Sequence, residues 1–201
     1  MQATHVLKRA AAGAVCAASA LMLPGPAQAA LQDRDLNGDT VVDAFYDTDL
    51  DITWLRDANV NGAMDWDTAV AWADGYSFGG YSDWRLPTSD TCSGYPCIGS
   101  EMGHLWYVEL GNPAGGPVTN TGDFQNMQSS RYWTGTEYAP DPSLAWFFNT
   151  YFGYQELTAK RLASYALAVR PGDVPAVPEP QTYALLGLGL AALAFVRRRQ
   201  R

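Results

Sequence analysis

Histidine is scarce in this chain, which has two histidines among 201 residues, and only His104 lies outside the N-terminal segment. A zinc site built on several histidines is therefore excluded, and a Ser-His-Asp triad would have to use this single residue. His104 falls in a predicted helix, residues 101–110, which Gly111 ends. We expect it to be a helix-surface or packing residue.

Basic residues are also few, with 13 Lys and Arg against 21 Asp and Glu, for a net charge of −8. Without the two terminal segments described below, seven basic and twenty acidic residues remain, for a net charge of −13. Phosphate binding requires a basic patch, so nucleic acid is excluded as a partner. The acidic surface also repels anionic polysaccharide unless metal ions bridge the two, which leaves neutral glycans and divalent cations as better ligands.

The N-terminus has the pattern of a secretory signal peptide, residues 1–29. Lys8 and Arg9 precede an apolar stretch, a Pro-Gly-Pro break and the sequence Ala27-Gln28-Ala29. Signal peptides combine a basic start, an apolar run and an A-x-A cleavage site. We therefore expect cleavage after Ala29 and one exported domain at residues 30–173.

The C-terminal segment, residues 174–201, joins Pro178-Glu179-Pro180 to an apolar run at 183–196 and a terminal arginine cluster. Fourteen helical residues span only about 21 Å, which is less than the ~30 Å hydrocarbon core of a membrane. The arginines resist translocation and should stay cytoplasmic. The segment resembles the PEP-CTERM sorting signal. That resemblance implies a Gram-negative host, transient anchoring in the inner membrane, cleavage by an exosortase and delivery to an exopolysaccharide-rich surface.

The exported domain has two cysteines, in the sequence Cys92-Ser-Gly-Tyr-Pro-Cys97. A redox-active pair is more typically Cys-x-x-Cys at a helix start, so a structural disulfide is predicted. Closing so short a loop stabilises the fold by about 2 kcal/mol.

Seven aspartates crowd the segment between Asp33 and Asp51. Residues 33–39 have the D-x-D-x-N-G opening of a calcium loop, but Ala44 occupies the twelfth position, where an EF-hand has glutamate. Asn-Gly and Gly-Asp also mark turns, and residues 40–42 suit a strand. A β-hairpin is favoured here. After it, residues 50–54 alternate apolar and polar side chains, which predicts a half-buried strand.

A second loop matches the calcium pattern better, with Gly62 at position 6 and oxygen ligands at positions 1, 3, 5 and 9 from Asp57, Asn59, Asn61 and Asp65. An apolar helical face follows from Trp66, with Asp65 as the predicted N-cap. Thr68 at position 12 lacks the bidentate carboxylate, so calcium would bind weakly, at roughly 10⁻⁴–10⁻³ M. A metal-free loop capped by Asp65 is the slightly favoured alternative.

Six motifs follow one another along the exported domain: Trp54-Leu55-Arg56-Asp57-Ala58, the Ala-rich helix at Trp66, Gly80-Tyr81-Ser82-Asp83-Trp84-Arg85-Leu86-Pro87-Thr88, Tyr132-Trp133-Thr134-Gly135-Thr136, Ala145-Trp146 and Ala168-Val169-Arg170. They occur in the order seen in the Lcl C-terminal domain family, a domain of unknown function, and this chain resembles that family over most of residues 50–171.

The helix followed by Arg-Leu-Pro-Thr is also similar to formylglycine-generating enzymes, which have a C-type-lectin-like fold. Those enzymes need a late cysteine pair, and no cysteine follows Cys97, so their activity is not expected. The similarity implies a C-type-lectin-like α+β fold with two helices packed on a twisted antiparallel sheet and long loops. It also implies burial of Trp84 and Trp133, and we expect Arg85 to be a half-buried ion-pair partner.

Aromatic residues near loops are candidates for stacking on sugar rings: Trp133, Tyr138, Trp146 and Tyr151. Within the irregular segment 137–143, we predict ligand binding by Glu137, Tyr138 and Asp141. No paired catalytic carboxylates, nucleophile elbow or phosphate loop stands out, so a non-catalytic polysaccharide-binding module assisted by weak calcium binding is predicted. The alternatives are a structural matrix protein without a specific ligand and a hydrolase using Glu137 or Asp141 as acid or base.

Overall fold

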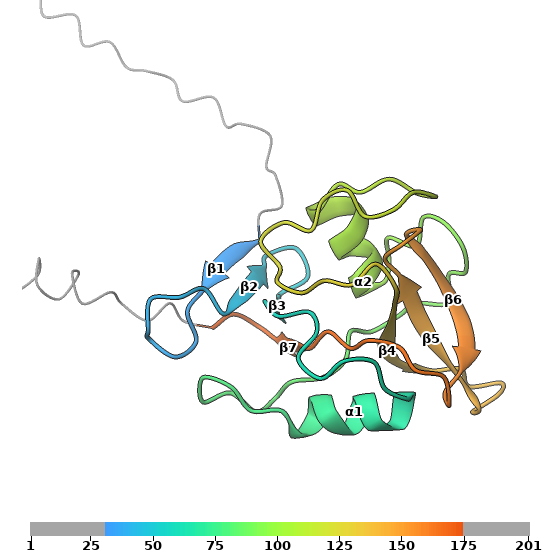
Figure 1. Cartoon of the computed structure of the whole chain (residues 1–201), viewed down its shortest axis with the longest axis horizontal. Coiled ribbons are helices and arrows are strands. Elements are labelled where there is room, and N and C mark those ends of the chain that lie inside the picture. Colours follow the sequence, from blue (N-terminus) through green and yellow to red (C-terminus); the bar gives the residue numbers. More distant parts are fainter. Residues whose placement is uncertain (1–30, 175–201) are drawn as a thin grey trace, which may run out of the picture.

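The computed structural model of the protein describes residues 31–174, which form two antiparallel sheets and two helical segments (Figure 1). The predicted α+β class is confirmed, and the strands divide between two sheets. C-type-lectin likeness stays a prediction. The signal peptide, Pro178-Glu179-Pro180 and the apolar C-terminal run lie outside the described residues.

The first sheet has the strand order β1-β2-β3-β7, with β1 at Gln32–Arg34, β2 at Ala44–Asp47, β3 at Ile52–Leu55 and β7 at Val169–Pro171. All four residues of β3 are buried, whereas the sequence predicted a half-buried strand. Thr53 causes the difference. Its hydroxyl donates to the Gly172 carbonyl oxygen at 2.8 Å, so a polar residue is accommodated in the interior.

The predicted hairpin in the aspartate-rich segment is confirmed by the antiparallel pairing of β1 with β2. The strand begins at Ala44, however, and residues 40–42 lie in the loop. The Asp35 carboxylate accepts hydrogen bonds from the backbone N–H groups of Asn37, Gly38 and Thr40. These bonds hold the loop in successive turns and keep Thr40 at φ +73°, outside the strand conformation.

The second sheet has the order β4-β5-β6, with β4 at Arg131–Glu137, β5 at Leu144–Asn149 and β6 at Tyr154–Ala159. The pairing of β4 with β5 shifts register between Trp133 and Glu137, which marks a β-bulge. Tyr132, Trp133 and Phe148 are fully buried where this sheet meets the core.

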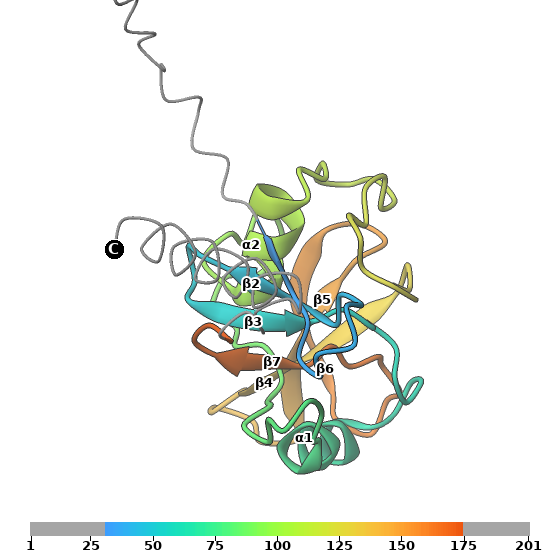
Figure 2. The same ribbon diagram turned by 90° about the vertical axis from the view of Figure 1, so that its left-hand side faces the viewer.

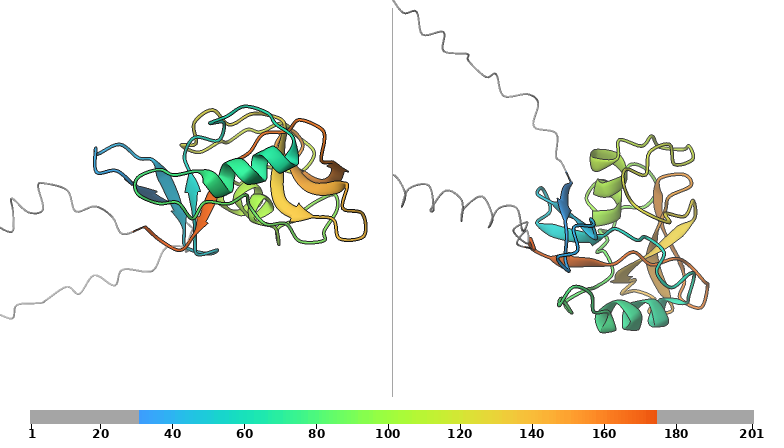
Figure 3. Two further views of the ribbon diagram at one scale, coloured as in Figure 1. Left: turned by 90° about the horizontal axis from the view of Figure 1, so that it is seen from below. Right: turned by 60° about the vertical axis from the view of Figure 1, so that its left-hand side comes forward.

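The helices lie on opposite sides of the strands (Figures 1 and 2). Helix α1 (Trp66–Gly75) begins where the Asp65 carboxylate accepts the Thr68 N–H at 3.0 Å, which confirms the predicted N-cap. Its Ala69 and Ala73 pack in a cluster with Trp133 and Ala145. Seen from below, α1 runs across the front of the strands (Figure 3).

The second predicted helix is also present, but it changes type along its length. Helix α2 (Glu101–His104) continues into a π-helical turn, η1 (Leu105–Glu109). Met102, Leu105 and Trp106 enter the main core. Within residues 31–174, no helix has the length and apolar character needed to cross a membrane.

Candidate functional site

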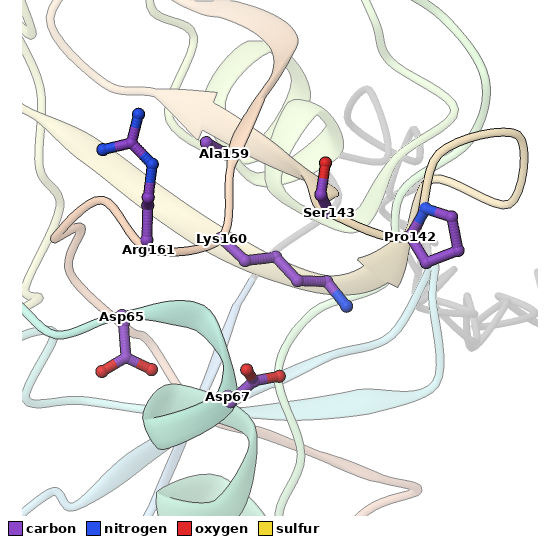
Figure 4. Close-up of a pocket in the computed structure, with 7 residues that line it drawn as sticks. All are labelled: Asp65, Asp67, Pro142, Ser143, Ala159, Lys160 and Arg161. Atoms are coloured by element: carbon purple, nitrogen blue, oxygen red, sulfur yellow. The ribbon is translucent and has the colours of Figure 1, made fainter.

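A cleft of about 770 Å³ opens between the start of α1, the β4–β5 turn and the end of β6 (Figure 4). The residues around it are Asp65, Asp67, Pro142, Ser143, Ala159, Lys160 and Arg161. The cleft therefore brings the end of the Asp57 loop next to the 137–143 segment, two regions that the sequence singled out separately.

Lys160 organises one wall of this cleft. Its ammonium group lies 3.9 Å from the centre of the Trp66 ring and pairs with the Glu137 carboxylate. The Trp66 indole N–H in turn donates to the Thr134 carbonyl oxygen at 2.8 Å. A cation held between an aromatic face and a carboxylate is a stable arrangement. Glu137 is therefore already engaged by the protein.

The 137–143 segment is held by its own hydrogen bonds. The Asp141 carboxylate accepts from the Ser143 hydroxyl at 2.7 Å and from the Ser143 N–H at 3.1 Å, and these bonds hold the pKa of Asp141 below its usual value. The Tyr138 ring packs edge-on against Trp146, with ring centres 6.2 Å apart. Asp141 thus shapes a turn, and Tyr138 is only half-exposed.

The Asp57 loop is also partly committed to internal contacts. The Asp57 carboxylate accepts from the Asn59 N–H at 2.9 Å and from the Asn126 side-chain amide at 3.0 Å. Both Asp65 oxygens accept from Thr68, which lowers the Asp65 pKa. Asn61 is exposed, whereas the Asn59 side-chain oxygen is buried without a hydrogen-bond partner in the described part of the chain.

Four aromatic rings form a surface at the β5–β6 turn, which we call the aromatic platform: Tyr95, Tyr151, Phe152 and Tyr154. Tyr95, Tyr151 and Phe152 are 49%, 44% and 39% exposed. Tyr154 lies among them, with ring centres 5.8 Å from Tyr95 and 6.1 Å from Phe152. Exposed rings in mutual contact form an apolar surface patch, and such patches are candidates for ligand contact.

The disulfide loop holds Tyr95 in this platform. Cys92 and Cys97 are joined, as the sequence predicted. The loop is bound to β6 because Gly94 and Gln155 exchange two backbone hydrogen bonds of 2.8 and 3.1 Å. The buried Gln155 amide also donates to the Cys92 carbonyl oxygen at 2.7 Å. Tyr95 therefore projects from a cross-linked loop fixed to a strand.

The β5–β6 turn holds Tyr151 and Phe152 with similar precision. The Asn149 side-chain oxygen accepts from both of their backbone N–H groups, at 2.8 and 3.3 Å. Gly153 follows with φ +79°, and a Cβ there would lie 2.5 Å from the Trp106 indole nitrogen. Only glycine fits this position, so the turn is locked against the core.

The comparisons with known families agree with this architecture. The model of the Lcl C-terminal domain matches residues 43–170. The chain belongs to the Lcl C-terminal domain family. The model of the PEP-CTERM protein-sorting motif matches residues 176–199, which include Pro178-Glu179-Pro180. Both resemblances in the sequence are thereby confirmed, and no curated protein matches the chain.

This member of the Lcl C-terminal domain family is therefore an exported surface protein that an exosortase processes, since its sorting motif directs it to the cell envelope. Neither family description names a catalytic activity.

The residues predicted from the sequence to contact sugar differ in their exposure. Trp133 and Trp146 are buried, as is Trp84, and Arg85 is a partly buried ion-pair partner of Glu101 at 2.7 Å. Tyr151 is exposed on the aromatic platform. Tyr95, Phe152 and Tyr154 were not predicted, although the sequence contains an aromatic Tyr-Phe-Gly-Tyr turn and a tyrosine between the two cysteines.

Proposed function

We propose that this protein is a non-catalytic binding module for a neutral extracellular polysaccharide, displayed at the cell envelope. The observation that supports the proposal most strongly is the aromatic platform, where three exposed rings and Tyr154 are held by a disulfide loop and a glycine turn. Sugar rings present apolar C–H faces that pack on aromatic side chains, and rings held rigidly lose little freedom on binding.

The negative charge of the exported domain favours a neutral polysaccharide over an anionic one. The exported domain carries seven basic and twenty acidic residues, so it repels an anionic chain at long range. Polar groups for hydrogen bonding to sugar hydroxyls flank the platform. Ser93 donates to Glu156 at 3.0 Å, and the Asn149 side-chain amide contacts the Tyr154 hydroxyl at 3.4 Å.

Catalysis by the 137–143 segment is not part of this proposal. Glu137 is paired with Lys160, and the lowered pKa of Asp141 keeps that carboxyl ionised near neutral pH. A general acid must instead keep its proton near the working pH, and a carboxylate with a lowered pKa is also a weak general base. Both acidic and basic side chains line the cleft beside α1. In this proposal the cleft is a secondary site of contact with sugar hydroxyls.

Calcium assists in this proposal through the Asp57 loop. The buried Asn59 oxygen lacks a partner, and a cation would supply one beside Asp57 and Asn61. Asp65 would join this ligand set by giving up a bond to Thr68, so binding is weak. The ion would stiffen the entry to α1 and reduce the local negative charge.

The C-terminal run at 183–196 would hold the protein transiently in the inner membrane before exosortase cleavage. The experiment that tests the function is an array of neutral and acidic polysaccharides probed with the exported protein, with and without calcium. Binding to neutral members supports the proposal. Blank arrays under both conditions indicate a structural matrix protein instead.

A further inference from the structure

His104 meets two carboxylates from separate parts of the fold. Its Nε2 lies 3.3 Å from Glu109 Oε1 and 4.0 Å from Asp47 Oδ1. Asp47 ends β2, His104 ends α2 and Glu109 ends η1. Their side chains are 0%, 13% and 2% exposed. The expectation that His104 is a surface or packing residue therefore omits its main contacts.

The π-helical turn explains why His104 and Glu109 face each other. Residues five apart in an α-helix are separated by about 140° around the axis, at 3.6 residues per turn. In η1 the Leu110 N–H bonds to the Leu105 carbonyl oxygen at 2.9 Å, which widens the turn. Single π turns are rare in proteins, and many of those that occur lie at functional sites.

The negative charge of the two carboxylates is not balanced by the basic groups around them. Within residues 31–174, no Lys or Arg forms an ion pair with Asp47 or Glu109, and His104 is the only basic group in contact with them. A protonated His104 would leave one uncompensated negative charge in a buried place, which is costly.

We propose that Asp47, His104 and Glu109 bind one divalent transition-metal ion of the Zn²⁺ class. Two carboxylate oxygens and a neutral imidazole nitrogen are typical ligands for such an ion, and a double positive charge neutralises both carboxylates. One ligand atom from each residue lies within 4.8 Å of the other two. Ligand atoms at about 2.1 Å from a tetrahedral ion lie about 3.4 Å apart. His104 lies 3.3 Å from Glu109 and 4.0 Å from Asp47, so Asp47 would move slightly towards the ion.

The surroundings of Asp47 support a role as ligand. Its Oδ1 accepts from the backbone N–H groups of Asp49 and Leu50 at 3.1 and 3.0 Å, and the Trp54 indole lies 3.4 Å from Oδ2. Metal-binding carboxylates are commonly oriented by such outer hydrogen bonds. The ion joins the turn after β2 to the α2–η1 segment, so it acts as a structural cross-link. Calcium prefers oxygen ligands, whereas this site includes an imidazole nitrogen, so it would bind a different ion from the Asp57 loop.

The test uses the protein recovered from the cells that export it, stripped of metal by a chelator and titrated with Zn²⁺ by calorimetry. We expect one Zn²⁺ per chain and a rise of several degrees in melting temperature. His104→Gln and Glu109→Gln should each weaken Zn²⁺ binding at least about tenfold. Asp39→Asn is the matched control, because Asp39 belongs to a different carboxylate group, with Asp35 and Asp43. It should bind Zn²⁺ as the unsubstituted protein does.

Three results would overturn the proposal. Zn²⁺ could leave the melting temperature unchanged, His104→Gln could bind Zn²⁺ normally, or Asp39→Asn alone could lose it. If His104→Gln fails to fold, the visible absorption spectrum of Co²⁺ added to the unsubstituted protein tests the site instead. Intense visible absorption bands support the site, and a spectrum like that of aqueous Co²⁺ contradicts it.

Discussion

The Tyr95 ring meets the Tyr154 ring edge-on, with centres 5.8 Å apart and planes inclined by 69°. One residue belongs to the Cys92–Cys97 loop and the other begins β6, so the contact links a cross-linked loop to a sheet. This contact holds the exposed Tyr95 ring against Tyr154, whose ring also contacts Phe152. A surface of this kind can receive a flat ligand without first ordering its own side chains.

The β5–β6 turn should tolerate no side chain at Gly153. Gly153→Ala adds a Cβ at 2.5 Å from the Trp106 indole nitrogen, in a backbone conformation with φ +79°. Gly80→Ala is the matched control, because φ there is +87° with open space around it. Left-handed strain alone costs about 1–2 kcal/mol. Urea denaturation should therefore show a larger loss for Gly153→Ala than for Gly80→Ala, and equal losses would contradict the steric argument.

Acid should weaken the contact between the first strand and the end of β7. Arg34 donates to Asp173 at 2.6 Å and holds the pKa of Asp173 below its ordinary value. The unfolded chain, with an aspartate pKa of about 3.9, then binds more protons than the folded one at low pH. The stabilisation is present above this value and is lost as the pH falls through the lower folded pKa.

The melting temperature measured from pH 6 to pH 2 checks this effect. Asp173→Asn should flatten the acid limb of the curve, and Asp123→Asn, an exposed loop residue without an ion pair in the described region, should leave it unchanged. The difference will be modest because the Asp173 side chain is well exposed and solvent screens the pair. An Asp173→Asn curve parallel to that of the unsubstituted protein would refute the assignment.

Millimolar calcium should raise the melting temperature through the Asp57 loop. At a concentration ten times the dissociation constant, the stabilisation is about 1.4 kcal/mol. Asp57→Ala should abolish the shift, whereas Asp141→Ala, outside the loop, should retain it. If calcium has no effect, or if Asp57→Ala responds fully, the Asp57 loop does not bind calcium.

Processing should remove both ends of the chain. Mass spectrometry of the protein at the cell surface or in the medium should find an N-terminus near Ala30 and no peptide containing Arg197 to Arg201. The sorting motif matches residues 176–199, so the cleavage falls near that segment. A surface protein with an intact C-terminus would contradict removal of the tail.

Local sequence patterns predicted the features that depend on contacts between residues close together in the sequence. Asp65 caps α1 because the cap bond joins residues three apart, and the short Cys92–Cys97 loop closes for a similar reason. Family motifs added the burial of Trp84 and Trp133.

The platform and the histidine cluster depend on long-range contacts that no local pattern contains. Tyr95 meets Tyr154 only because Gln155 binds the disulfide loop, and His104 meets Asp47 only because α2 packs beside the turn after β2. The buried Thr53 and the π turn at η1 also escaped prediction. In each case tertiary packing overrides the pattern of apolar and polar residues.

The measurement that most directly tests the central claim is the affinity of the exported protein for the neutral polysaccharides of the array. Tyr95→Ser and Tyr151→Ser should each weaken binding about tenfold or more, since truncating an aromatic anchor residue in a binding surface commonly costs about 2 kcal/mol. Tyr46→Ser, a half-exposed tyrosine on β2 in the other sheet, should bind normally. Unchanged binding by both platform variants, or loss of binding in Tyr46→Ser alone, would contradict the account.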